Sequence, residues 1–311
     1  LQEQAKKLCV VSRAFYTDNL GKFLKTACEI TGMERALPMN TGVEAVETAL
    51  KAARKWGYDV KGIEKDNAEI ITCSGNFHGR TLSVVGFSSE EQYKSGFGPF
   101  AAGFVQIPFA DSEALESAIT ENTAAFLVEP IQGESGIIIP PDGYLKRCAE
   151  ICKKHNVLLI CDEVQTGLGR TGTLLACQHD NVKPDGLILG KALGGGILAV
   201  SLFLSRAEIM DVFTPGDHGS TFGGNPLSCA VALEALQILV EENLVEKSRD
   251  MGEYFLTQLS AIQSPLIKEV RGRGLFIGIE FYKDKISART VCEQLLKYGI
   301  LSKETPDTVA R

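Results

Sequence analysis

The sequence predicts an α/β protein whose main sheet is largely parallel. Two observations predict this class. Short apolar segments typical of buried strands alternate with longer segments of helical composition. Polar residues gather where those strands end, as they do at the carboxyl edge of a parallel sheet. The pattern changes near residue 245, so we expect a large domain over residues 1–244 and a smaller α+β domain over residues 245–311.

Composition narrows the functional class. The 311 residues are 44% hydrophobic and 23% charged, which is ordinary for a globular enzyme. A net charge of −7 argues against nucleic acid or an anionic membrane as the main partner. The nine cysteines are odd in number and irregularly spaced, so we expect free thiols and no metal site. No leader opens the chain, so the cytoplasm is the expected compartment. The mitochondrial matrix is the alternative, because a leader could lie outside this chain.

The first elements are helical. Residues 1–37 are expected to be largely helix with a turn at 18–21. A second helix, rich in Ala, Leu, Lys and Arg, follows through about Trp56, with Asn40 or Thr41 as its N-cap. The free amides at such a helix start can hold a phosphate. An ordinary capped helix has the same pattern, so both interpretations stay open.

The rest of the large domain alternates between strands and helices. Each expected strand is a short apolar run bounded by polar residues or glycine, and the segment 214–226 is too rich in glycine and hydroxyls to be a strand. The expected strands span residues 69–73, 125–128, 157–161, 186–189 and 199–204. The expected helices span residues 143–155 and 227–242.

The expected smaller domain begins with a helix to about Ser260. Strands follow within residues 267–280, then a helix over 287–298 and a strand near Ile300.

Lys191 stands at the end of the apolar strand 186–189, after a glycine. A lysine in this position is poorly solvated, which favours its neutral amine. A neutral amine is the nucleophile that bonds to a carbonyl cofactor. A nucleotide-phosphate loop does not fit, because Asp185 occupies the place of its first glycine and Ala192 follows the lysine.

Asp162 stands at the end of another strand, 29 residues before Lys191. A strand–helix–strand crossover spans that separation, so the two side chains can meet. A carboxylate there can keep a ring nitrogen protonated, while the lysine binds the cofactor, which is what a protein contributes to pyridoxal 5′-phosphate chemistry. In the loop 74–81, Phe77 can stack on a flat ring and Arg80 can hold a carboxylate.

Three motifs together resemble the class III aminotransferases of fold type I. They are CDEVQTGLGRTG at residues 161–172, GKALGGG at 190–196 and GSTFGGNP at 219–226. Within that family the chain is most similar to the branch that acts on ornithine. The closer match lies in SRAFY at 12–16, MNTGVEA at 39–45, RKWGYDVKG at 54–62 and GNFHGR at 75–80. The chain resembles a central portion of such an enzyme, without the N-terminal segment and the end of the small domain.

The resemblance implies a role for each motif residue. Lys191 would bind the cofactor and move a proton, Asp162 would pair with the pyridine nitrogen, Gln165 would bond the ring oxygen and Phe77 would stack on the ring. The remaining implied residues fall into two groups: Gly42, Val43 and, from the partner subunit of a homodimer, Ser220 and Thr221 for the phosphate; Arg80, Arg311 and Glu134 for substrate carboxylates and their control.

The implied reaction transfers the terminal amine of ornithine to 2-oxoglutarate, giving glutamate 5-semialdehyde and glutamate. Relatives that act on acetylornithine or 4-aminobutyrate share Lys191 and Asp162, so these activities are alternatives. An inactive dimer that binds the cofactor is an alternative of another class.

Overall fold

A computed structural model describes all 311 residues. Its main sheet has seven strands in the order β1-β7-β6-β5-β4-β2-β3, and β7 alone runs against its neighbours. The expected α/β class is therefore confirmed. The strands are β1 Arg35–Met39, β2 Glu69–Cys73, β3 Phe104–Ile107, β4 Thr123–Val128, β5 Leu158–Asp162, β6 Gly186–Leu189 and β7 Ser201–Ser205.

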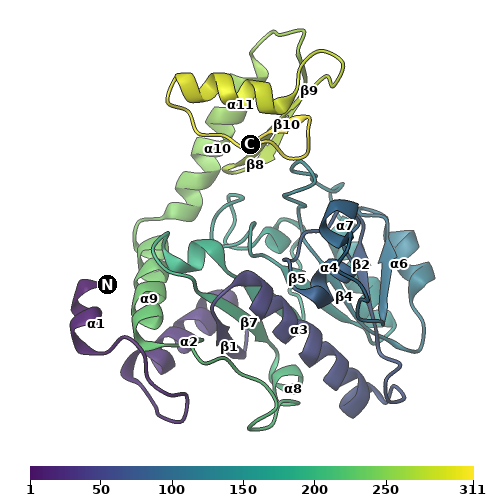
Figure 1. Ribbon diagram of the computed structural model, residues 1–311, viewed down its shortest axis with the longest axis vertical. Helices are drawn as coiled ribbons and strands as arrows, with labels where there is room; N and C mark the ends of the chain where they lie inside the picture. The colour runs from purple at the N-terminus through teal and green to yellow at the C-terminus, as the bar shows by residue number, and fades with distance from the viewer.

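Helices cover both faces of this sheet (Figure 1). Alternate strand residues enter two different cores: Leu187 packs with the cluster that includes α2, α7 and α9, while Ile188 packs with the cluster that includes α3. Strands buried on both faces are continuous apolar runs, which is why the sequence shows them clearly. The helices are α1 Gln2–Lys7, α2 Asp18–Thr31, α3 Gly42–Trp56, α4 Leu82–Gly86, α5 Glu91–Lys94, α6 Ser112–Ala118, α7 Tyr144–Lys154, α8 Ala207–Met210 and α9 Pro226–Glu241.

The C-terminal part forms a separate sheet with the order β10-β9-β8 (Figure 1). The helix α10 joins this small sheet to α9. The small core beside the sheet includes Phe281, Ala288 and Cys292. The boundary at residue 245 stays a prediction. The elements are α10 Leu244–Ser260, β8 Ile267–Arg273, β9 Phe276–Phe281, α11 Ala288–Lys297 and β10 Val309–Ala310.

Three local expectations are wrong. The turn expected at 18–21 is the start of α2, where Asp18 lies in the first turn and suits the positive end of the helix dipole. Residues 35–39 form β1 although they contain Pro38, because β1 is an edge strand and an edge tolerates a missing amide donor. No strand forms near Ile300; instead β10 pairs with β9.

No helix of the protein is both long and apolar enough to cross a membrane. No group of three or more His, Cys, Asp or Glu side chains is placed to hold a metal ion.

Candidate active site

The carboxyl ends of β5 and β6 bring Asp162 and Lys191 to the same edge of the sheet. The two strands pair in parallel, and Asp162 lies opposite Ile188. Lys191 comes three residues after Ile188, just beyond the end of β6. Lys191 opens a 3-10 turn that ends at Gly194 and has a φ of +43°, which is uncommon for a residue with a side chain. This turn directs the lysine out of the sheet and into a cavity.

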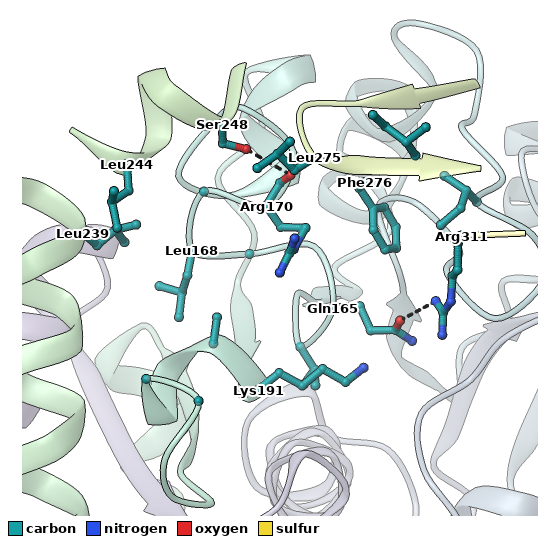
Figure 2. A pocket seen from close by; sticks show the side chains of 18 residues that line it. Gln165, Leu168, Arg170, Lys191, Leu239, Leu244, Ser248, Leu275, Phe276 and Arg311 are labelled. Carbon is teal, nitrogen blue, oxygen red and sulfur yellow. Dashed lines mark hydrogen bonds between the residues drawn. The ribbon is translucent and has the colours of Figure 1, made fainter. Parts of the chain in front are cut away.

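The cavity has a volume of about 760 Å³ and lies between the large sheet and the small one. Figure 2 shows Lys191, Gln165 and Arg311 on one side of it and Leu168, Leu239 and Leu244 on the other. Lys191 is accessible from the cavity, yet the surrounding walls desolvate its amine and lower its pKa, against the opposing charge of Asp162. The expected shift toward a neutral amine is therefore present.

Asp162 is buried and held on both carboxylate oxygens. Its Oδ1 accepts from the amide of Val164 at 3.0 Å, and its Oδ2 lies 2.7 Å from Nδ1 of His78. Burial disfavours the charged imidazole, but Asp162 outweighs it and raises the pKa of His78. His78 has no role in the site predicted from the sequence. Its place between Phe77 and Arg80 was the available signal of a site residue.

Glu129 directly follows β4 and is also buried. Its carboxylate accepts from the amide of Phe77 at 2.9 Å, so it fixes the loop that carries Phe77 and His78. Burial raises the pKa of Glu129 to about 7; nearby His78 opposes this rise and Asp162 adds to it.

Two other polar residues, Glu163 and His218, make their contacts elsewhere. The carboxylate of Glu163 accepts from the hydroxyl of Thr166 and from the amides of Ala176 and Cys177. His218 contacts Thr48 and Lys51 on α3, away from the cavity.

The N-terminus of α3 has free donors. Thr41 and Glu44 form a capping box that satisfies part of the first turn, and the amides of Gly42 and Val43 donate no hydrogen bond within the chain. Gly79 comes so close that a Cβ on it would lie 2.3 Å from Cγ2 of Val43. The loop that carries Phe77 and Arg80 is therefore packed directly on this helix start.

Ser220 reaches the same region of its own chain. Its Oγ accepts from Nδ2 of Asn40 at 2.9 Å and from the amide of Gly223 at 3.0 Å. Thr221 is exposed and makes no side-chain hydrogen bond within the chain.

Arg80 and Arg311 are in opposite situations. The guanidinium of Arg80 has no hydrogen-bond or ion-pair partner and lies 4.3 Å from the ring centroid of Tyr93. Arg311 pairs with Glu134 through Nη2 and donates from Nη1 to Oε1 of Gln165 at 3.1 Å.

Glu134 has a second cationic neighbour, Nζ of Lys303 at 3.0 Å. Burial raises the pKa of Glu134, but Lys303 and Arg311 together outweigh it and hold the pKa below its ordinary value. Lys303 was absent from the sequence predictions.

Comparison with known proteins identifies the family. The model of the "Aminotransferase class-III" family matches residues 1–311. The chain belongs to the class-III aminotransferases. Over 311 residues this aminotransferase is 59% identical to ornithine aminotransferase 2 of Staphylococcus aureus, a match that covers 100% of the chain and 78% of that protein.

Solved structures agree with the fold of this aminotransferase. It is similar to ornithine aminotransferase from Toxoplasma gondii, with a TM-score of 0.98, 48% identity and coverage of 100% of this chain and 74% of that one. It is also similar to acetylornithine aminotransferase from Elizabethkingia anophelis, with a TM-score of 0.90, 49% identity and coverage of 100% and 77%.

The cofactor of this family is pyridoxal 5′-phosphate, and unpaired groups of the aminotransferase fit it. Nε2 of Gln165 is buried without a partner, although buried donors are nearly always paired. The free amides of Gly42 and Val43 at a helix N-terminus suit a phosphate. Asp162 supplies a buried carboxylate for a ring nitrogen.

Proposed function

We propose that this aminotransferase moves the terminal amino group of ornithine to 2-oxoglutarate, giving glutamate 5-semialdehyde and glutamate. The observation that carries the substrate assignment is the pair between Glu134 and Arg311 beside Lys191. The 59% identity to an ornithine aminotransferase supports it. Acetylornithine is the second candidate, because an acetylornithine aminotransferase is 49% identical to this chain.

Each site residue has a task toward the cofactor. Pyridoxal 5′-phosphate, when bound, supplies an aldehyde for amines and a ring that accepts electrons. Nζ of Lys191 would hold the cofactor and would carry a proton from the substrate carbon. Asp162 would keep the ring nitrogen protonated, and Gln165 would donate its unpaired Nε2 to the ring oxygen. Phe77 would cover the ring face, while Gly42 and Val43 would bind the phosphate.

The two arginines sort the substrates. Ornithine has to react at its terminal amine, although its α-carboxylate resembles that of any amino acid. With Arg311 masked by Glu134, the free Arg80 takes the α-carboxylate of ornithine and places the far amine at Lys191. Glutamate and 2-oxoglutarate carry a second carboxylate, which displaces Glu134 from Arg311. A partly desolvated ion pair is costly to break unless another anion replaces it, so the substrate itself opens the site.

Replacing Glu134 tests this assignment. Glu134→Ala should retain or accelerate the glutamate half-reaction and weaken the preference for the terminal amine of ornithine. Stopped-flow half-reactions with both amino acids, with product analysis for α-transamination, measure this. Lys303→Ala is the matched control, because it removes a cation from Glu134 but leaves the pair with Arg311 intact. An unchanged ratio of half-reaction rates in Glu134→Ala, with terminal-amine product alone, would rule the switch out.

We further infer a homodimer in which Ser220 and Thr221 reach the phosphate of the partner subunit. Two-fold symmetry gives such a dimer two equivalent sites. The cytoplasm is the proposed compartment, supported by the bacterial relative, with the mitochondrial matrix as the alternative.

A further inference from the structure

The guanidinium of Arg80 contacts two aromatic rings and donates no hydrogen bond within the chain. It lies 4.3 Å from the ring centroid of Tyr93 and 5.8 Å from that of Phe77. No carboxylate or carbonyl oxygen is within hydrogen-bonding distance of its side chain. Arg311, by contrast, donates to both Glu134 and Gln165. An aromatic face attracts a cation through its quadrupole and leaves every N–H group available for a carboxylate.

Tyr93 is itself fixed to the site loop. Its ring meets Phe77 edge to face, with centroids 5.9 Å apart and an interplanar angle of 77°. The short helix α5 that carries Tyr93 is preceded by Ser89, whose Oγ accepts from the amide of Gly75 at 2.7 Å. The side-chain Nδ2 of Asn76 also donates to the carbonyl of Phe87 at 3.0 Å. Two hydrogen bonds therefore tie the loop 74–81 to the segment before Tyr93.

We propose that Tyr93 is a positioning residue that sets where Arg80 holds the substrate carboxylate, and thereby which substrate length the site accepts. The proposal rests on the proposed function of Arg80. The distance from Lys191 to the guanidinium fixes how many carbons separate the reacting amine or carbonyl from the bound carboxylate. A guanidinium without a partner on a flexible side chain samples several positions, and the ring of Tyr93 selects one of them.

The aromatic face is the working part of Tyr93, because its hydroxyl makes no hydrogen bond within the chain. Tyr93→Phe should therefore preserve function and Tyr93→Leu should remove it. In the loaded, full-length enzyme, we expect Tyr93→Leu to raise the Kd for glutarate and the KM for 2-oxoglutarate about tenfold, with kcat within twofold of the parent. Discrimination between 2-oxoglutarate and 2-oxoadipate, which has one more methylene group, should fall as well. Tyr93→Phe should stay within twofold of the parent on each measure.

Arg80→Ala separates failure of this proposal from failure of the proposed function. If Arg80→Ala leaves glutarate affinity, measured by calorimetry, unchanged, Arg80 does not bind the carboxylate and the proposed function loses that assignment. If Arg80→Ala weakens glutarate binding but Tyr93→Leu does not, the role of Tyr93 is overturned. In the Arg80→Ala background, adding Tyr93→Leu should cause no further loss of affinity, because the two residues act through one contact.

Fluorination keeps the test decisive if Tyr93→Leu does not fold. Pentafluorophenylalanine at position 93 has nearly the shape of phenylalanine but lacks its electron-rich face. Glutarate affinity should fall severalfold relative to Tyr93→Phe. Equal affinity in the two proteins would show that packing, and not attraction of the cation, is the role of the ring.

Discussion

Two buried carboxylates, Asp162 and Glu129, hold the segment that carries Phe77 and His78. Asp162 holds the ring of His78 through a hydrogen bond of 2.7 Å, and Glu129 holds the backbone one residue earlier. The segment Phe77–His78 is thus fixed through the backbone amide of Phe77 and the side chain of His78. Burial makes these contacts matter, because an ionised carboxylate without partners would be strongly disfavoured there.

Glu129→Gln should change how the free energy of unfolding depends on pH. Burial raises the pKa of Glu129 from an ordinary value of 4.5 to about 7, so the folded protein keeps a proton that the unfolded chain releases between those values. Stability from this group is therefore lost as pH rises across that window, by about 3 kcal/mol in total. Glutamine cannot ionise, so the variant should gain on the parent by up to that amount between pH 5 and pH 8, as measured by urea unfolding.

The same variant should shift the titration of His78, followed by NMR. The charged groups coupled to Glu129 are His78, Asp162 and Lys191, with the thiol of Cys73 nearby. Loss of the negative charge should lower the pKa of His78. Glu163→Gln is the control, because Glu163 is also buried with a raised pKa but is bonded elsewhere. Equal shifts of His78 in both variants would contradict the coupling.

At the scale of elements, the site is assembled where α3 begins and β5 and β6 end. The loop after β2 packs on the N-terminus of α3 through the contact of Gly79 with Val43. The residue proposed to cover the cofactor ring, Phe77, and the amides proposed to bind its phosphate are therefore held by the same contact. Gly79 has a φ of +131°, a conformation that residues with side chains rarely adopt.

Gly79→Ala should destabilise the protein by about 1–3 kcal/mol and weaken cofactor binding, because its Cβ would overlap Val43. Urea unfolding and a cofactor titration measure the two effects. Gly21→Ala serves as the control. Gly21 lies inside α2, and an added Cβ would have nothing within 4 Å of it. This substitution should therefore stabilise the protein by about 0.5–1 kcal/mol. A Gly79→Ala protein with unchanged stability and cofactor affinity would show that this packing is not required.

At the scale of the whole molecule, the proposed homodimer gives Ser220 and Thr221 a role across the interface. Ser220 contacts Asn40 of its own chain, two residues before the α3 terminus. The resemblance implies instead that it serves the partner's cofactor.

Subunit complementation distinguishes the two arrangements. Lys191→Ala and the double variant Ser220→Ala, Thr221→Ala should each have impaired activity when tested alone. After co-refolding, a mixed dimer has one site with an intact lysine and an intact loop, provided that the loop acts across the interface. Recovery of activity well above either parent variant is the expected outcome. Absence of recovery in isolated mixed dimers would place the loop in its own subunit's site.

The sequence alone determined the elements that are locally encoded. β2 and β6 have the bounds expected for them, because strands buried on both faces are short continuous apolar runs. The helix at Gly42 begins as expected because Thr41 and Glu44 form a cap within four residues. The polar residues after β5 and β6 indicated the site edge for the same reason, since strand ends are visible in the sequence.

Only the tertiary structure decided the contacts between distant segments. β1 depends on pairing with β7, some 165 residues later, and no local pattern identifies an edge strand that contains Pro38. Three contacts join different loops: the hydrogen bond between His78 and Asp162, the hydrogen bond from the amide of Phe77 to Glu129, and the packing of Arg80 on the ring of Tyr93. Burial and hydrogen bonding set their strength, and both are properties of the assembled fold, not of neighbouring residues in the chain.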